Sequence, residues 1–227
     1  MKRIFIFISI LCLTGVANRL FAQEVKINTN LAVEADGTVR MDGDATVWDD
    51  LMVYPDATSR SSNNPPTFTL FKSNSSQGVW IWGFSNSTEQ EVYFTVQIPH
   101  KYKVGSDLKP HVHWTTFDGN SAPTRTNVVW GLEYTVVKIG GTFGNTTTIT
   151  GNSVIAGIPT ISGTGQHLIT SLGTISGTNF EISTVLVCRL FRKVADANDT
   201  YNNLTGLLGF DIHYEIDTEG SREEYVK

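Results

Sequence analysis

The ten residues 208–217 read Leu-Gly-Phe-Asp-Ile-His-Tyr-Glu-Ile-Asp, and apolar and polar side chains alternate along them. Successive side chains of a β-strand point to opposite faces, so Phe210 and Ile212 share one face while Asp211 and His213 share the other. This alternation is typical of an antiparallel sheet with one buried face and one face in water. The stretch therefore predicts a long strand whose outer face carries ionisable groups.

Segments of the same kind recur along the chain. They are rich in Val, Ile, Thr and aromatic residues, are bounded by Gly, Asn, Ser and Asp, and show no helical period. We expect strands near 67–72, 78–84, 90–98, 110–116, 127–138, 145–150, 165–173, 180–193 and 206–217. Such a chain predicts an all-β fold, an antiparallel β-sandwich that is jelly-roll-like. The predicted core contains Val92, Phe94, Val96, Trp130, Leu132, Phe210 and Ile212.

Residues 1–22 have the features of a secretory signal peptide. Lys2 and Arg3 precede an apolar stretch at 4–16, and Leu-Phe-Ala at 20–22 offers a cleavage site. The apolar stretch is too short to cross a bilayer comfortably, although a retained anchor is the alternative interpretation. We therefore expect a secreted, cell-surface or periplasmic protein with no stable membrane span after cleavage.

Two divisions follow the signal peptide. Residues 23–56 contain short alternating pieces and turn signals, which predict an N-terminal arm or strand extension. Residues 57–227 hold the long alternating segments and are predicted to form the β-sandwich domain. Within that domain, residues 57–66 are polar and contain two prolines, so we expect an exposed loop there.

Charge and cysteine content exclude some classes of protein. Removing residues 1–22 takes away three basic residues and no acid, which changes the formal net charge from −5 to −8. A chain this acidic, without a Lys/Arg-rich run, is not expected to bind nucleic acid. Only Cys188 remains after cleavage, so no intrachain disulfide is possible and the stability has to come from a core.

Histidines lie on the polar faces of two predicted strands. His111 and His113, in Pro-His-Val-His-Trp at 110–114, share a face, and His213 lies on the polar face described above. We predict that the three histidines occupy one continuous polar surface with Asp211, Glu215 or Glu133. That surface is open to three interpretations: a metal site, a pH-sensitive contact between subunits, or a solvated face with ordinary hydrogen bonds.

The metal interpretation starts from His111 and His113. Two imidazoles on one strand face could bind a first-row metal together with a third ligand such as His213. The segment after Gly105 also resembles the first cupin motif, but Phe117 or Asp118 stands where cupins have Glu. We therefore expect no cofactor, and a divalent metal remains the alternative.

An aromatic string lies at 79–84, Val-Trp-Ile-Trp-Gly-Phe. Trp80, Trp82 and Phe84 share one face of the predicted strand and could form a platform on which a sugar stacks. The opposite face is apolar too, which favours a buried core strand over a ligand platform.

Familiar catalytic arrangements are missing from the sequence. There is no Gly-x-Ser-x-Gly nucleophile motif. Cys188 lies within an apolar segment, where a thiol is usually an inert small hydrophobe. The sequence therefore predicts that the chain is not an enzyme.

Several strings together resemble a known family. They are Ala-Thr-Val-Trp-Asp-Asp-Leu at 45–51, Phe-Ser-Asn-Ser-Thr-Glu-Gln-Glu at 84–91, Pro-His-Val-His-Trp at 110–114, Asn-Val-Val-Trp-Gly-Leu-Glu-Tyr at 127–134, Asp-Ile-His-Tyr at 211–214 and Gly-Ser-Arg-Glu-Glu-Tyr-Val-Lys at 220–227. In their order and spacing they are similar to a β-rich family of uncharacterised, virion-associated proteins of tailed phages and prophages, over residues 37–227. The resemblance brings no catalytic residue with it, and the signal peptide is an addition to the family's pattern.

The resemblance implies a structural or attachment module. Segment 180–193 is apolar on both faces at its centre, which predicts a central strand or an interface strand. We therefore expect an exported, phage-like, self-assembling β-sandwich, a homo-oligomer such as a trimer. The alternative is a carbohydrate-binding or metal-binding jelly-roll protein, with a surface glycan as its partner.

Overall fold

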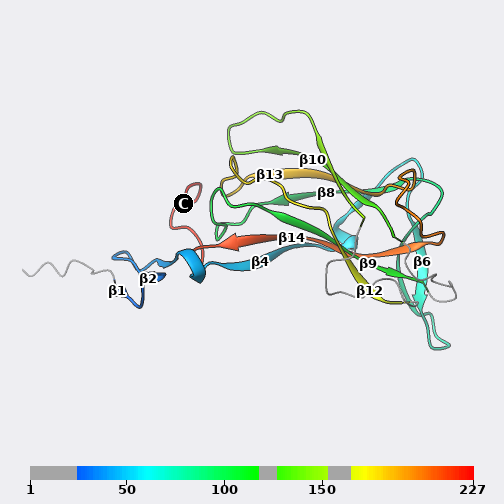
Figure 1. Ribbon diagram of the computed structural model, residues 1–227, viewed down its shortest axis with the longest axis horizontal. Coiled ribbons are helices and arrows are strands. Elements are labelled where there is room, and N and C mark those ends of the chain that lie inside the picture. Colours follow the sequence, from blue (N-terminus) through cyan, green and yellow to red (C-terminus); the bar gives the residue numbers. More distant parts are fainter. Residues whose placement is uncertain (1–24, 118–126, 153–164) are drawn as a thin grey trace, which may run out of the picture.

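The computed structural model describes residues 25–117, 127–152 and 165–227. Over these ranges the regular secondary structure is almost entirely β-strand, and the paired strands are antiparallel (Figure 1). Two large sheets pack against each other, and a small third sheet extends from one end. This arrangement confirms the predicted all-β, antiparallel sandwich.

Each large sheet brings together strands that are far apart in the sequence. The six-stranded sheet contains β12 (His167–Ser171), β9 (Lys109–Thr116), β14 (Thr205–Ile216), β7 (Val79–Phe84) and β6 (Thr67–Lys72) in that order, with β4 (Val47–Val53) also paired to β14. The five-stranded sheet contains β11 (Thr147–Gly151), β10 (Trp130–Val137), β13 (Val185–Arg192), β8 (Gln90–Gln97) and β5 (Ser59–Arg60) in that order. The predicted central position of β13 is confirmed, because it lies between β10 and β8.

The core lies between the two large sheets. All seven residues predicted for it are buried. Aromatic rings join the layers: the Phe94 and Phe210 ring centroids are 4.9 Å apart, and those of Phe84 and Trp130 are 5.1 Å apart. The prediction for residues 208–217 is therefore confirmed, since one face of β14 packs into the core.

The expected N-terminal arm, residues 23–56, divides into two parts. β1 (Val25–Lys26), β2 (Leu31–Val33) and β3 (Val39–Met41) form the small sheet, which a short 3₁₀ turn, η1 (Gly43–Ala45), connects to β4. β4 itself belongs to the six-stranded sheet. The sequence did not predict β4 because two adjacent aspartates interrupt its alternation, whereas backbone pairing does not depend on side-chain type.

The polar segment 57–66 is also not wholly a loop. A second 3₁₀ turn, η2 (Pro55–Ala57), leads from β4 into β5, whose two residues pair with Tyr93 and Val92 of β8. The expectation of an exposed loop is therefore wrong at Ser59 and Arg60. Both are exposed, so the segment joins the sheet through its backbone and buries no side chain there.

A bulge in β14 positions the candidate site. Along one edge β14 pairs with β9 over nearly its whole length, and along the other it pairs first with β7 and then with β4. The register shifts between Leu207 and Gly209, which leaves Leu208 as an extra residue. Leu207 and Phe210 are thus both buried although they are three residues apart. The bulge lies where pairing with β7 ends and pairing with β4 begins.

The predicted signal peptide, residues 1–22, lies outside the described residues. In the part of the chain that the structure describes, no helix has the length and apolar character needed to cross a membrane.

Candidate functional site: a histidine cluster and an aromatic groove

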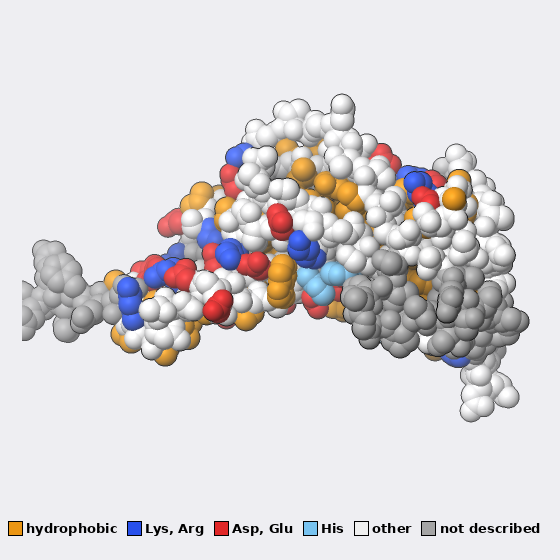
Figure 2. Space-filling model, viewed as in Figure 1, with side chains coloured by type: hydrophobic (Ala, Val, Ile, Leu, Met, Phe, Trp, Pro, Cys, Tyr) orange, Lys and Arg blue, Asp and Glu red, His pale blue; other side chains and the backbone are white. Residues whose placement is uncertain are grey.

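Asp211 is the centre of a cluster of imidazoles on the outer face of the six-stranded sheet. In the register of β14 and β9 it lies directly opposite His111, and His113 lies opposite Gly209. His213 is two residues further along β14 and therefore points to the same face. Figure 2 shows the histidine side chains gathered in one patch of the surface. The structure thus brings together the three histidines and one of the three acids that the sequence suggested.

Distances in the cluster differ from one histidine to the next. His113 Nε2 lies 2.9 Å from Asp211 Oδ2, which is a hydrogen bond. His213 Nε2 is 3.7 Å from the same oxygen and 3.0 Å from Oδ1 of Asp50, the residue of β4 that lies opposite His213. His111 Nδ1 is 3.6 Å from Asp211 Oδ1, and the His111 and His213 rings are 4.3 Å apart.

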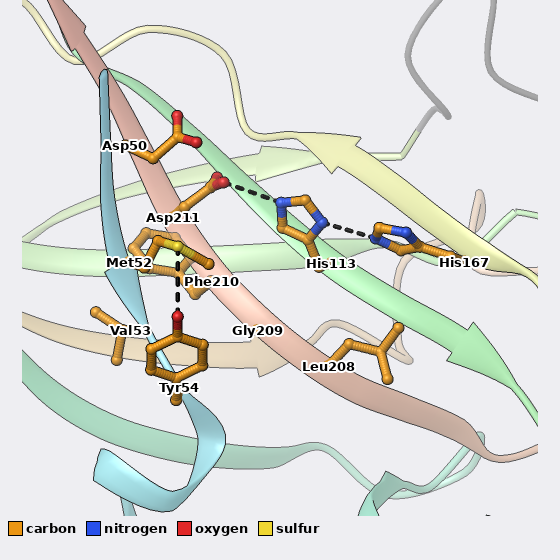
Figure 3. A pocket seen from close by; sticks show the side chains of 10 residues that line it. All are labelled: Asp50, Met52, Val53, Tyr54, His113, His167, Leu208, Gly209, Phe210 and Asp211. Carbon is orange, nitrogen blue, oxygen red and sulfur yellow. Dashed lines mark hydrogen bonds and ion pairs between the residues drawn. The ribbon is translucent and has the colours of Figure 1, made fainter.

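A fourth histidine extends the cluster. His167 of β12 places Nε2 2.8 Å from His113 Nδ1, so that His167, His113 and Asp211 form a chain of hydrogen bonds (Figure 3). Sequence reasoning missed His167. His167 lies in the predicted strand 165–173, so the alternation of side chains assigns it to one face of that strand. The sequence does not show, however, which strand pairs with β9.

The Asp211 carboxylate is held ionised in a buried position. Only 3% of the residue is exposed. Burial alone raises the pKa of its carboxyl, but the surrounding imidazoles of His111, His113 and His213 lower it by more, so the pKa lies well below its usual range. Burial, and then the neighbouring His113, lower the pKa of His167.

Two buried atoms in the cluster lack hydrogen-bond partners, His111 Nδ1 and Asp211 Oδ1. His111 Nδ1, His213 Nε2 and an oxygen of Asp211 lie within 4.8 Å of one another, which is close enough for the three residues to share a metal ion. His113 is outside this group of possible ligands, and its two nitrogens are engaged by Asp211 and His167.

The other predicted site acids lie elsewhere. Glu133 is on β10 of the opposite sheet, 3.2 Å from Arg189, so the proposed shared surface does not include it. Glu215 shares the outer face of β14 but pairs with Lys103 at 2.6 Å. Of the two residues at the cupin glutamate position, Phe117 packs against Phe71, and Asp118 lies outside the described residues.

A hollow of about 280 Å³ opens beside the cluster, at the bulge. Side chains and backbone of β4, β9, β12 and β14 line it, namely Asp50, Met52, Val53, Tyr54, His113, His167, Leu208, Gly209, Phe210 and Asp211 (Figure 3). Its walls are mainly apolar, and its polar groups come from the histidine cluster.

A second hollow, an aromatic groove of about 300 Å³, adjoins the first and shares Tyr54 and Leu208 with it. It is lined by Tyr54, Pro55, Asp56, Phe68, Trp80, Ile81, Trp82, Leu207 and Leu208. The Phe68 ring lies 4.8 Å from Trp82 and 5.9 Å from Trp80. Trp80 is 45% exposed and Phe68 is 50% exposed, although both belong to paired strands.

The groove corrects the prediction made for residues 79–84. β7 is not a buried core strand throughout, because it is exposed at Val79 and Trp80 and buried only towards Phe84. Phe84 is fully buried against Trp130 and is therefore no part of a platform. The physical reason is position: β7 and β6 are the last two strands of their sheet, and β6 lies at one end of the sandwich, where it runs across the direction of the other strands (Figure 1).

Comparisons with known proteins give structural similarities only. No family model matches the chain, and no curated protein matches it. The solved structures similar to it include TmCBM61 in complex with β-1,4-galactotriose, at 15% identity and a TM-score of 0.25, covering 78% of this chain and 88% of that one.

Two other similar structures are much longer than this chain. The enzymatically active domain of bacteriophage CBA120 tailspike protein 4 has 10% identity and a TM-score of 0.27 over 74% of this chain and 19% of its own. Dimeric latent PorU from Porphyromonas gingivalis has 9% identity and a TM-score of 0.29 over 76% of this chain and 13% of its own. At these values the similarities bear on the β-rich fold and carry no residue roles.

The prediction from the sequence that the chain is not an enzyme is contradicted. The solved structures similar to the chain include an enzymatically active domain. The reason is that catalytic groups on a β-fold come from separate strands, and their pairing is invisible to a motif search. What stands is the β-rich fold itself.

Proposed function

We propose that the protein is an exported attachment module that holds a carbohydrate in the aromatic groove. One observation carries the proposal: the exposed Phe68 and Trp80 and the partly buried Trp82 form an aromatic strip on the β6–β7 hairpin, inside a hollow. Exposed aromatic clusters of this kind are uncommon on a soluble surface without a binding role.

The chemistry of the groove suits a sugar. A pyranose ring has apolar C–H faces and a polar rim of hydroxyl groups, so it stacks on flat aromatic side chains and hydrogen-bonds at its edge. Trp80 and Phe68 offer flat apolar surfaces, and Asp56 lines the same groove. Arg60, whose guanidinium lies 4.7 Å from the Trp82 ring, supplies donors beside it. A mainly apolar cleft with a few fixed polar groups is the usual form of a small-ligand site.

The aromatic side chains are held in place before any ligand arrives. Trp80 donates from Nε1 to the carbonyl of Gln77 at 2.9 Å, and Phe68 packs against both tryptophans. Since Phe68 pairs with Trp82 across the hairpin, backbone hydrogen bonds also set their spacing. A preorganised site loses little side-chain entropy on binding, which favours affinity.

Export and self-assembly complete the proposal. A signal peptide at 1–22 would carry the module out of the cell, and a homo-oligomer would present several grooves at once. Several weak sugar contacts then add up, because the second contact is made at a high effective concentration. Light scattering on the purified chain gives its mass in solution. A monomer removes the assembly part of the proposal and leaves the groove untouched.

The groove is tested with a glycan array followed by titration of the best ligand into the wild type and two variants. Trp80→Ala removes an exposed aromatic wall of the groove and is expected to weaken binding tenfold or more, since truncating a tryptophan anchor usually costs more than about 1.4 kcal/mol. Trp48→Ala is the matched control, because Trp48 is 53% exposed on β4 outside the groove.

Folding of both variants is checked by thermal unfolding before the titration. Equal affinities of the wild type and Trp80→Ala, or a loss confined to Trp48→Ala, overturn the groove as the binding site. Absence of any ligand on an array of neutral and acidic glycans counts against carbohydrate as the ligand class.

A further inference from the structure

Two buried polar atoms on the outer face of the six-stranded sheet face each other without a hydrogen bond. His111 Nδ1 and Asp211 Oδ1 are 3.6 Å apart, which is beyond hydrogen-bonding distance, and neither has another partner. Buried polar atoms in folded proteins almost always have a partner, and each exception calls for an explanation such as an ion. The two atoms are therefore placed to bind a shared ligand such as a metal ion.

A third ligand atom completes the arrangement. His213 Nε2 lies 3.7 Å from Asp211 Oδ2, and one atom from each of the three residues lies within 4.8 Å of the others. Ligand atoms about 2.0–2.1 Å from a tetrahedral zinc ion stand about 3.4 Å from one another. To bind such an ion, the ligand atoms need to approach one another by between a fraction of an ångström and about 1.4 Å.

The sheet holds these ligands in place. Asp211 and His111 are directly opposite in the register of β14 and β9, and His213 is the next residue on the same face of β14. Around them is a supporting layer: His113 donates from Nε2 to Asp211 Oδ2, and His167 bonds to the other nitrogen of His113. Hydrogen bonds of this kind orient metal ligands and raise metal affinity.

A fourth coordination position is available next to the ligands. Asp211 lines the hollow at the bulge, and so does Asp50, whose Oδ1 is 3.0 Å from His213 Nε2. Either a water molecule from the hollow or the Asp50 carboxylate can occupy that position. Sites with three protein ligands and one open position are the catalytic form of zinc coordination, whereas a closed set of four is the structural form.

The geometry points to a divalent transition-metal site of the zinc class, with His111, Asp211 and His213 as its ligands and a fourth position open toward the hollow. Two imidazoles and one carboxylate suit zinc and its neighbours in the first row. Calcium and magnesium prefer sets made of oxygen atoms alone, which this cluster does not provide. The inference is independent of the proposed function, because the aromatic groove needs no metal to hold a sugar.

The test uses the full chain without an affinity tag, stripped with a chelator and titrated with zinc by calorimetry. The wild type is expected to bind one zinc ion per chain, and cobalt(II) is expected to give the visible absorption bands of a four-coordinate ion. His213→Gln is the main variant, because His213 is partly exposed on a strand surface and the change should not affect folding. It is expected to weaken zinc binding at least tenfold and to abolish the cobalt spectrum.

His100→Gln is the matched control, because His100 is bonded to Ser221 and Ser183 and is not one of the grouped ligands. It is expected to bind zinc as the wild type does. The proposal is overturned if the wild type binds no zinc, if His213→Gln binds as tightly as the wild type, or if His100→Gln loses the ion equally. Calcium in place of zinc is expected to give no heat, and binding of calcium at the same residues would contradict the zinc class.

Discussion

Each large sheet has a charged residue in a central strand that gathers polar partners on the outer face, and the two clusters differ in how complete they are. In the five-stranded sheet Arg189 of β13 collects glutamates, and in the six-stranded sheet Asp211 of β14 collects histidines. Both arise from the same rule, that cross-strand neighbours on one face lie within reach of each other.

The Arg189 cluster is complete. Its guanidinium bonds to Glu91 at 2.9 and 3.2 Å and to Glu133 at 3.2 Å, and it also bonds to Glu89. The same group stacks over the Phe191 ring at 4.1 Å. A cation with this many partners in fixed positions fills a structural role, since its charge and its donors are already used.

The Asp211 cluster is more deeply buried and less complete. One carboxylate oxygen and one facing imidazole nitrogen have no partner, and a hollow opens next to them. This difference indicates that a buried charged group whose hydrogen bonds are all satisfied has a structural role. A buried charged group that has unsatisfied hydrogen-bonding atoms beside a cavity is the better candidate for a functional site, because leaving those atoms unsatisfied lowers the stability of the fold.

The largest expected effect contrasts two glycines. A Cβ at Gly131 would lie 2.3 Å from the Phe191 ring that Arg189 covers, whereas a Cβ at Gly209, in the hollow, would meet only the Val53 carbonyl at 3.9 Å. We expect Gly131→Ala to lower the free energy of unfolding by about 2–3 kcal/mol through overpacking. Gly209→Ala is expected to change it by less than about 0.5 kcal/mol. Urea denaturation measures both, and a larger loss at Gly209 would contradict the view that the hollow is open space.

The next effect compares the two central charges. Arg189→Met leaves three glutamates without their cation, and we expect a loss of about 2 kcal/mol in the free energy of unfolding. Asp211→Asn keeps the shape of a side chain whose bonding is incomplete, so we expect a loss below about 1 kcal/mol in metal-free protein. Chelator-treated samples at pH 7 give both values by urea denaturation. If Asp211→Asn proves the costlier change, the cluster is structural in the way that Arg189 is.

A smaller effect is expected with pH. Burial raises the pKa of Glu91, but Arg189 together with the hydroxyls of Ser61 and Tyr93 lowers it by more, so the folded pKa lies below the ordinary 4.5. A carboxyl with a lowered pKa stabilises the fold above the unfolded-state pKa, and this contribution is lost as the pH falls through the folded pKa. Between pH 7 and pH 3 the wild type should therefore lose more unfolding free energy than Arg189→Met, by up to about 1 kcal/mol. Equal losses would show that Arg189 does not hold Glu91 ionised.

The smallest expected effect is at Cys188, which follows Val187 in β13 and points into the core. Burial raises the pKa of its thiol to about 12, so it reacts with iodoacetamide only when the five-stranded sheet opens. Because separate sites act almost independently, Asp211→Asn should change the labelling rate by no more than about twofold. Mass analysis of the Cys188 peptide follows the reaction, and Arg189→Met serves as the positive control with faster labelling.

Much of the fold was readable from local patterns. The strand predicted at 67–72 coincides with β6, and the predicted core residues, Phe94 and Phe210 among them, are buried. These predictions succeed because alternation is a local property: each residue's face depends on its position along its own strand. For the same reason His111, His113 and His213 could be assigned to outer faces without knowing the topology.

The alternation of side chains alone could not show which strands lie side by side in one sheet and so share an outer face. It placed Glu133 beside the histidines, although Glu133 lies on the other sheet with Arg189, and it could not show that the strand of His167 pairs with β9. The pairing of β12, β9, β14 and β4 depends on backbone hydrogen bonds and on burial summed over the whole molecule, which no short stretch encodes.

The sequence by itself therefore determined the fold class, the core-facing residues and the presence of histidines and acids on polar strand faces. Only the tertiary structure decided that Asp211 lies among the imidazoles of His111, His113 and His213 beside a bulge, and that Trp80 and Phe68 stay exposed on the two last strands of their sheet. The physical reason is that alternation is set residue by residue along one strand, whereas adjacency and curvature are set by contacts between strands distant in the chain.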